Sequence, residues 1–320
     1  DLGLAGDTTG ISDFTIGDEL QGGLTLYAQT WVHNKDLPYS FGNLRVGPLG
    51  LITLIPYQNG DSNYSNDYGV KLNLAGLIID NGGLIQTNGK GYPAHLGPGI
   101  GTDPGDWKRG AASYGGYGSE SPATPGTPYG SLYLPRDLGS GGRGDNVPGG
   151  GALEFNIIGD TIINGRIEAN GTPGSGHAGG SSGGSILLFT NTIGGTGLIQ
   201  ANGSAGDAQG GGGSGGRIAV YYSLNNGFNF STSTQARGGL GGSWNPEKTG
   251  GPGTVYHEDR NSDREFGGSL IINNSPYTGR AMDFAAQQWN FANITIGENI
   301  TTWVLSDIEN NRGVVFDLSG

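Results

Sequence analysis

Five residues between positions 103 and 117 have side chains of the kinds that bind sugars. Carboxylates accept hydrogen bonds from hydroxyl groups, and Trp and Tyr rings offer a broad apolar face with a polar tip. The set consists of Asp103, Asp106, Trp107, Tyr114 and Tyr117. A glycan contact surface is therefore one hypothesis for this stretch, and a solvated loop is the simpler interpretation.

Side chains with oxygen atoms alternate along residues 59–67. They are Asn59, Asp61, Asn63, Ser65 and Asp67. A Ca²⁺-binding loop supplies oxygen ligands at alternate positions, so this segment is a candidate calcium site, and calcium is the only cofactor that the sequence suggests. Such a loop ends in a Glu at its twelfth position, where this chain has Val70. The same residue types form polar turns between strands, which is the simpler interpretation.

Patterns that resemble catalytic motifs arise by chance in a chain this rich in Gly. Residues 174–179 fit a dinucleotide-binding glycine pattern but lead into a strand-like run rather than a helix. Residues 180–184 and 212–216 fit a hydrolase pattern without recurring acidic and His partners. Arg166 and Glu168 share one face of a strand, where we expect an outward ion pair. We therefore predict no catalytic residues and no enzyme activity, with a polysaccharide-cleaving β-helix enzyme as the alternative.

The composition limits both the fold and the partners. The chain has 320 residues, of which 67 are Gly, and only 34% are hydrophobic. Each Gly inside a helix costs about 1 kcal/mol relative to Ala, which disfavours a helical protein. The formal net charge is −12, which disfavours nucleic acid and anionic membranes as partners. There is no Cys and no apolar stretch long enough to cross a bilayer, so we expect neither disulfides nor a membrane span.

Two kinds of strand-like segment recur along the chain. One kind ends in Asn-Gly or a similar turn and covers residues 84–89, 166–171, 198–203 and, more weakly, 232–239. The other follows a Gly-rich tract and covers residues 150–155, 183–189, 215–222 and 252–258. Gly171 and Gly203 are 32 positions apart, and Ala152 and Ser185 are 33 apart. Units this short cannot bury their apolar faces alone and must stack. The sequence predicts an all-β fold, a right-handed parallel β-helix (solenoid) with long Gly-rich loops and little or no helix.

Alternation within the second kind of strand distinguishes two faces. Leu153, Phe155, Ile186, Leu188, Ile218 and Val220 fall on an aliphatic face that we expect to line the core. The other face is mixed, so it is either covered by the Gly-rich loops or used for contact. We expect Asn88, Asn170 and Asn202 to stack at one corner, because Asn tolerates left-handed turn geometry and its amide can bond to the next coil.

The chain divides into three predicted parts. Residues 1–80 and 258–320 form N-terminal and C-terminal β coils, and residues 81–257 form the Gly-rich β-helix. Within the latter, residues 93–149 interrupt the repeat as a Gly- and Pro-rich excursion, and segments of this kind are usually functional or disordered. Residues 24–76 match residues 270–320 in three short stretches in the same order. We therefore expect the two ends to be copies of one unit, and the protein to associate end to end or with neighbouring repeats.

Residues 70–257 resemble the glycine-rich parallel β-helix segments of large prokaryotic surface and secreted proteins. The resemblance rests on GGALEF (150–155), RIEANG (166–171), GGSILLF (183–189), LIQANG (198–203) and GGRIAVYY (215–222). Proteins of this kind are adhesins, stalks or fibre components. The resemblance implies an extracellular, cell-surface structural or adhesive role, as a repeat segment or subunit of a filament. A glycan is the other partner we expect, and a glycan-binding surface module is a further alternative.

Overall fold

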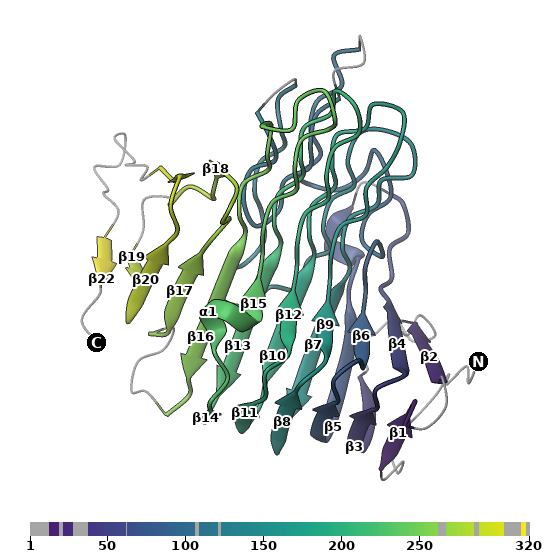
Figure 1. The fold of residues 1–320 in the computed structure, drawn as a ribbon, viewed down its shortest axis with the longest axis vertical. Coiled ribbons are helices and arrows are strands. Elements are labelled where there is room, and N and C mark those ends of the chain that lie inside the picture. The colour runs from purple at the N-terminus through teal and green to yellow at the C-terminus, as the bar shows by residue number, and fades with distance from the viewer. Residues whose placement is uncertain are drawn as a thin grey trace.

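The protein is built almost entirely of β-strands. The computed structural model describes residues 13–18, 22–27, 38–61, 63–105, 109–120, 123–261, 267–284, 288–303 and 315–317. Within these ranges the only helices are α1 (Phe230–Ser233) and the single 3₁₀ turn η1 (Tyr64–Asn66). The expectation of an all-β fold with little helix is confirmed. Long segments without regular secondary structure extend beyond the strands and fill the upper part of Figure 1.

The larger sheet has twelve strands and is curled and mostly parallel. Its path runs in the order β14 (Leu224–Asn226), β11 (Thr192–Gly194), β8 (Asp160–Ile163), β5 (Val70–Ile79), β7 (Ala152–Ile157), β10 (Ser185–Phe189), β13 (Arg217–Tyr222), β16 (Thr254–Asp259), β17 (Ser269–Ile272) and β20 (Asn293–Ile296). β3 (Tyr39–Val46) pairs with β5, and β1 (Phe14–Ile16) pairs with β3. Among the described strand pairs, β16 with β17 is the one antiparallel pair.

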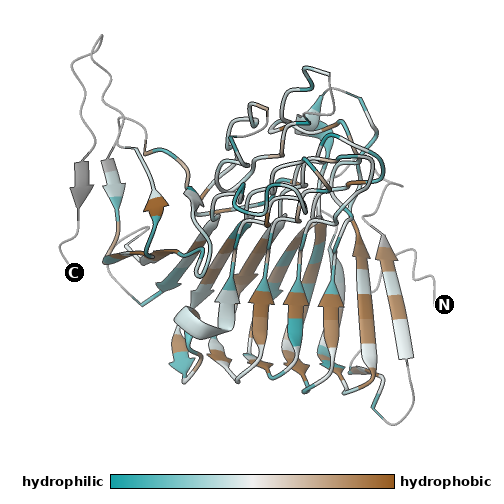
Figure 2. Cartoon of the chain, turned by 45° about the horizontal axis from the view of Figure 1, so that its top comes forward, coloured by the Kyte–Doolittle hydropathy of each residue, from teal (hydrophilic) through white to brown (hydrophobic). Residues whose placement is uncertain are grey.

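A smaller parallel sheet of six strands lies beside the larger one. Its order is β15 (Thr234–Gln235), β12 (Leu198–Gln200), β9 (Arg166–Glu168), β6 (Leu84–Gln86), β4 (Gly50–Ile55) and β2 (Gly22–Tyr27). Two further pairs join β18 (Gly279–Arg280) to β21 (Ile300–Thr301) and β19 (Gln288–Asn290) to β22 (Val315–Asp317). Figure 2 shows brown, hydrophobic stretches along the strands of both sheets and paler or teal connections.

Strands that are three apart in the chain pair with each other in the middle of the molecule. β7 pairs with β10 and β10 with β13, while β8 pairs with β11 and β9 with β12. Ser185 is aligned with Ala152 on one side and with Arg217 on the other. The predicted spacing of 33 and then 32 residues is therefore the register of the parallel pairs.

The rows of aliphatic residues predicted for the core do stack across these strands. Leu153, Ile186 and Ile218 are aligned in one row and are buried. Phe155 and Leu188 begin the next row, which is also buried. Burying one such side chain contributes roughly 1.5–3 kcal/mol, so these rows stabilise the fold.

The opposite face of β10, β13 and β16 is covered as well. Leu187, Ala219 and Tyr256 lie in a second buried cluster with Leu132 from the 93–149 segment and with Phe291 next to β20. Residues 93–149 therefore lie over this part of the larger sheet. In the described part of the chain, the outer face of β3, β5 and β7 lines an open groove instead.

An Asn residue from each repeat stands at the same corner, as predicted. The N–H of Asn170 donates to Oδ1 of Asn88 (2.7 Å), and the N–H of Asn202 donates to Oδ1 of Asn170 (2.8 Å). The N–H of Arg237 donates in turn to Oδ1 of Asn202 (2.8 Å). Each amide thus satisfies a backbone donor of the following repeat at a point where the strands have ended.

We expect Asn170→Ala to lower the free energy of unfolding by about 1–2 kcal/mol, because the partly buried N–H of Asn202 loses its acceptor. Urea unfolding monitored by circular dichroism measures the change. Asn164→Ala is the matched control, since its Oδ1 accepts from the N–H of Thr196 at a solvent-exposed position where water can replace it. We expect a change within about 0.5 kcal/mol for the control. Equal losses in both variants would contradict a structural role for the Asn corner.

The Gly-rich segments are joined by backbone hydrogen bonds that repeat every third residue. Four consecutive N–H groups reach three different neighbouring segments. The donor and acceptor pairs are Gly212 to Lys248, Gly213 to Ser204, Ser214 to Ala112 and Gly215 to Gly251. A β-strand directs its N–H groups to two neighbours only, whereas a polyproline II backbone has three residues per turn. The hydrogen-bond period is therefore that of a polyproline II-type backbone.

Glycine is required in these segments because their backbones touch. A Cβ added at Gly213 would lie 2.0 Å from the carbonyl oxygen of Ser181, and one at Gly183 would lie 2.2 Å from that of Ala201. The axis of collagen excludes side chains for the same reason. The stretches expected to be loops are thus a packed layer beside the strands, and the 93–149 excursion contributes Ala112 to it.

The matched segments at the two ends pair differently. β2, in the first copy of the match, pairs with β4 in the smaller sheet, whereas β17, in the second copy, pairs with β20 in the larger sheet. Much of 304–320 lies outside the described residues, so the duplication remains a prediction.

The described residues contain no helix with the length and apolarity that a membrane crossing requires.

Candidate functional site

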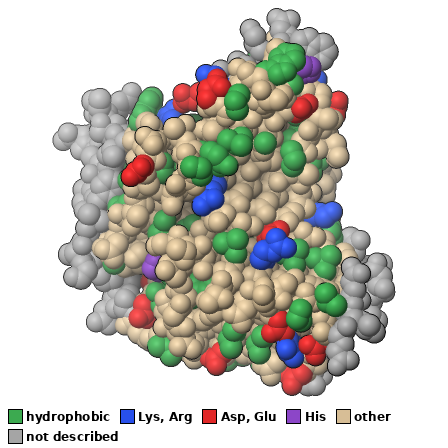
Figure 3. All heavy atoms as spheres, in the orientation of Figure 1, with side chains coloured by type: hydrophobic (Ala, Val, Ile, Leu, Met, Phe, Trp, Pro, Cys, Tyr) green, Lys and Arg blue, Asp and Glu red, His purple; other side chains and the backbone are tan. Residues whose placement is uncertain are grey.

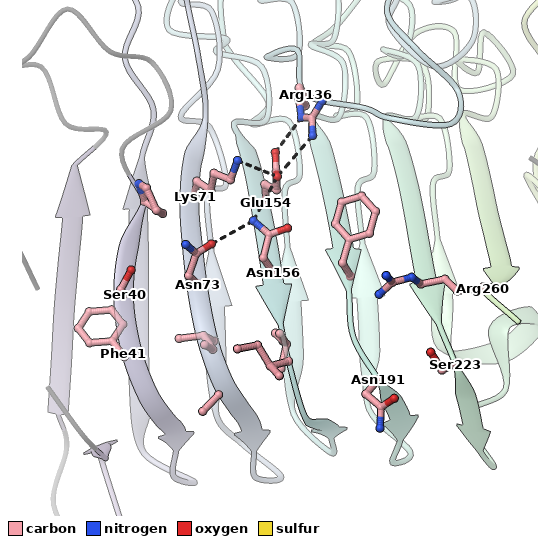
Figure 4. A pocket seen from close by; sticks show the side chains of 16 residues that line it. Ser40, Phe41, Lys71, Asn73, Arg136, Glu154, Asn156, Asn191, Ser223 and Arg260 are labelled. Atoms are coloured by element: carbon pink, nitrogen blue, oxygen red, sulfur yellow. Dashed lines mark hydrogen bonds and ion pairs between the residues drawn. The ribbon is translucent and has the colours of Figure 1, made fainter. Parts of the chain in front are cut away.

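An open groove of about 1250 Å³ crosses the accessible outer face of the larger sheet. Its polar and charged lining residues are Ser40, Lys71, Asn73, Arg136, Glu154, Asn156, Asn191, Ser223 and Arg260 (Figure 4). A second cavity of about 540 Å³ shares Lys71, Arg136 and Glu154 with it. The two cavities therefore adjoin, and together they form an elongated groove with an ion-pair cluster between its two parts.

Strand pleating places the lining residues of β5 and β7 on one face. In β5, Leu72 is buried in the core, whereas Lys71 and Asn73 on either side of it point outward. The register then aligns Lys71 with Glu154 and Asn73 with Asn156 on β7. Side chains on neighbouring strands lie about 4.8 Å apart, so the groove has a row of polar groups at regular intervals.

Four of these side chains form one hydrogen-bonded network around Glu154. Nε of Arg136 lies 2.7 Å from Oε2 of Glu154, and Nζ of Lys71 lies 3.3 Å from Oε1. Nδ2 of Asn156 donates to Oε1 of Glu154 (3.3 Å) and to Oδ1 of Asn73 (3.1 Å), as Figure 4 shows. The network fixes the positions of both cations and both amides at the floor of the groove.

Glu154 is held in its ionised form. Burial by itself would raise the pKa of Glu154, but the hydrogen bond from Arg136 and the charges of Arg136 and Lys71 outweigh it, so the pKa lies below its usual value. A general acid needs a pKa near the working pH. Glu154 therefore suits the positioning of cations rather than proton donation at neutral pH.

The larger part of the groove carries an excess of positive charge. Among the residues that the structure describes, its ionisable lining residues are Lys71, Arg136 and Arg260 against Glu154, which gives 3 − 1 = +2. Arg136 is half exposed, and Figure 4 shows the guanidinium group of Arg260 directed into the groove toward β10. The whole chain has a net charge of −12, so this surface is a local exception and attracts anions.

The smaller part of the groove has acidic and aromatic lining. Asp67, Asp137, Tyr64 and Tyr68 surround it. Burial raises the pKa of Asp137, and the charge of the buried Arg217 partly offsets this effect. An anion is therefore expected in the larger part of the groove and not in the smaller one.

Tyr114 and Tyr117, which the sequence suggests as sugar contacts, lie in different surroundings. Tyr114 is fully buried, with its ring centroid 4.6 Å from that of Tyr129. Burial raises its pKa, and no surface of its ring is open to a sugar. Tyr117 is partly buried beneath the guanidinium of Arg280, 4.0 Å from the ring centroid, and its hydroxyl donates to Asp283 (2.9 Å). The protein thus uses both rings for internal contacts.

The remaining members of that set give no further support to a sugar site. Asp103 is exposed, and its carboxylate accepts from the N–H of Gly105 (3.3 Å) within its own turn. Asp106 and Trp107 lie outside the described residues. The described members therefore do not line the groove on the strands.

Four side-chain oxygen atoms of the candidate calcium loop accept hydrogen bonds within the loop, whereas Oδ2 of Asp67 is buried and has no hydrogen-bond partner among the described residues. Oδ1 of Asn59 accepts from the N–H of Asp61 (3.1 Å), and Oδ1 of Asp61 accepts from the N–H of Asn63 (2.7 Å). Oδ1 of Asn63 accepts from Ser65, and Oδ1 of Asp67 accepts from the N–H of Asn59. These contacts are those of a polar turn. In the part of the chain that the structure describes, no three His, Asp or Glu side chains gather at metal-binding distance.

The sequence pattern contains part of the signal for the groove. It assigns Glu154, Asn156 and Phe189 to the mixed outer face, which is where they lie. It gives no sign that Arg136 joins them, because this residue comes from the irregular 93–149 excursion.

Comparison with family models, with curated proteins and with solved structures finds no match to this chain.

Proposed function

We propose that the chain is a segment of an extracellular structural and adhesive β-solenoid, wound as a right-handed parallel β-helix. The observation that carries the proposal is the in-register stack of β7, β10, β13 and β16. Parallel strands joined by crossovers are almost always right-handed. A stack of this kind is quasi-one-dimensional, which suits a stalk or a fibre.

The edges of the described sheets support growth along the stack. Among the described strands, β2 pairs only with β4, and β15 pairs only with β12. An edge strand presents unpaired N–H and C=O groups that can pair with another chain. We therefore infer that neighbouring repeats of the same protein or a second copy of the chain continue the stack.

The surface composition supports an adhesive role, with a glycan-binding module as the second candidate. In Figure 3, uncharged polar side chains and backbone dominate the visible face, and charged groups are scattered. Such a surface offers many hydroxyl, amide and peptide groups for hydrogen bonds. The elongated groove is the specific observation that favours the second candidate.

Sedimentation velocity at increasing protein concentration, with electron microscopy of the same samples, tests the structural role. We expect a series of oligomers that lengthen along one axis. Thr25→Lys on β2 should reduce this association, because charge on an edge strand opposes pairing. Ile162→Lys, an exposed position on the internal strand β8, is the control and should not change it. A monomer of one size at every concentration would overturn end-to-end assembly.

A further inference from the structure

We propose that the groove over β3, β5, β7 and β10 binds a carboxylated polysaccharide that lies across the strands. This proposal names a ligand for the adhesive surface, and it does not depend on filament assembly. The groove is open and elongated, with about 1250 Å³ in its larger part. An open groove of this shape suits a segment of a polymer better than a small enclosed ligand.

The cations of the groove supply the recognition of carboxylates. Glu154 takes two hydrogen bonds from Arg136 and one ion pair from Lys71, so both cations are held beside one carboxylate. Arg260 makes no side-chain hydrogen bond or ion pair with any residue that the structure describes, and its guanidinium faces the groove. A ligand with several carboxylates along its length can pair with this remaining charge.

The amides of the groove supply the recognition of hydroxyl groups. Asn156 uses its two N–H groups on Glu154 and Asn73, which leaves its Oδ1 toward the groove as an acceptor. Asn73 accepts from Asn156, so its own Nδ2 group remains as a donor. An acceptor and a donor on neighbouring strands match sugar hydroxyls, each of which can donate and accept.

An aromatic ring marks the end of the polar row. Phe189 is aligned with Asn156 on the next strand and is partly exposed. Its ring stacks on that of Tyr221, with centroids 4.9 Å apart and planes within 16° of parallel. A fixed ring beside polar groups provides an apolar face for the C–H side of a sugar. Charge, amides and ring together favour an acidic polysaccharide over an acidic peptide.

Isothermal titration calorimetry with hexagalacturonate, its methyl ester and poly-glutamate tests the proposal on the whole chain. We expect the acidic sugar to bind at least about tenfold more tightly than the ester, with the difference reduced by salt. The acidic sugar should also bind more tightly than poly-glutamate. Equal binding of acid and ester would overturn recognition of the carboxylates, and equal binding of poly-glutamate would overturn the choice of a glycan. No binding of either sugar would overturn the proposal as a whole.

Variants locate the binding in the groove. The double variant Arg136→Gln/Arg260→Gln should weaken binding of the acidic sugar at least about tenfold. Arg166→Gln is the matched control. Arg166 forms an ion pair with Glu168 (2.9 Å), as Arg136 does with Glu154, and the side chains of Arg166 and Arg136 are 52% and 54% exposed. The control lies on β9 in the smaller sheet and should bind as the unmodified chain does. Thermal unfolding of each variant shows that it is folded. Unchanged binding by the folded double variant would overturn the location.

Discussion

Replacing Gly213 with Ala is expected to lower the free energy of unfolding by about 3 kcal/mol or more. The new Cβ would lie 2.0 Å from the carbonyl oxygen of Ser181 and 2.4 Å from its carbon. Gly213 also donates to Ser204 and accepts from Gly239, so its backbone cannot move away without breaking these bonds. Urea unfolding monitored by circular dichroism measures the loss.

Gly23→Ala is the matched control for the crowded glycine. Gly23 lies on the edge strand β2, and a Cβ there would meet only the carbonyl oxygen of Leu51, at 3.9 Å. We expect a change of less than about 0.5 kcal/mol, because Ala adds no close contact and restricts the unfolded chain slightly. If Gly213→Ala were as harmless as Gly23→Ala, the Gly-rich segments would not be a packed layer.

Acidification from pH 7 to pH 4 is expected to destabilise the protein through His257 by up to about 3 kcal/mol. Burial lowers the pKa of His257 from 6.5 to about 4 in the folded protein. Its ring stacks on that of Phe230, with centroids 4.0 Å apart, and Nδ1 lies 3.4 Å from the hydroxyl of Tyr222. Neither contact supplies a negative charge to an imidazolium group.

The direction of the pH effect follows from the pKa of His257 in the unfolded chain, 6.5, and in the folded protein, about 4. Above pH 6.5 the ring is neutral in both states and has no effect on the pH dependence. Between pH 6.5 and about 4 the unfolded chain binds a proton that the folded chain does not, so the free energy of unfolding decreases as the pH falls. Below about pH 4 both states are protonated and the loss no longer grows.

Unfolding free energies of the unmodified chain and of His257→Gln between pH 4 and pH 7 isolate this contribution. We expect the variant to have a shallower pH dependence, whatever its stability at pH 7. Tyr222→Phe is the control, since it removes the neighbouring hydroxyl and keeps the buried imidazole. We expect this control to keep the slope of the unmodified chain. Parallel curves for the unmodified chain and His257→Gln would contradict the prediction.

The strand register and the core were predictable because they depend on local periodicity. A period of two along each strand separates Leu153 from Glu154, and a spacing of 33 residues aligns Ala152 with Ser185. The Asn corner follows from the same spacing. Stacked repeats contact mainly their neighbours, so a short unit of sequence already contains most of the information about its packing.

The role of the Gly-rich tracts was not predictable in the same way. Their composition indicates turns and loops, because Gly is permissive and has no side chain to bury. Contacts such as the one between Gly213 and Ser181 join residues 32 positions apart with no hydrophobic pattern to mark them. Only backbone proximity in three dimensions distinguishes a packed glycine layer from a flexible loop.

The sequence by itself determined that the chain is all-β, that its strands stack in register, and which face of each strand enters the core. These properties follow from the hydrophobic period and the repeat spacing, which are one-dimensional. Only the tertiary structure decided which part of the outer face is covered and which is open. That outcome depends on where the aperiodic 93–149 segment lies, since it buries Leu187 beneath Leu132 and brings Arg136 to Glu154. The groove is thus formed by long-range contacts, and no local pattern encodes it.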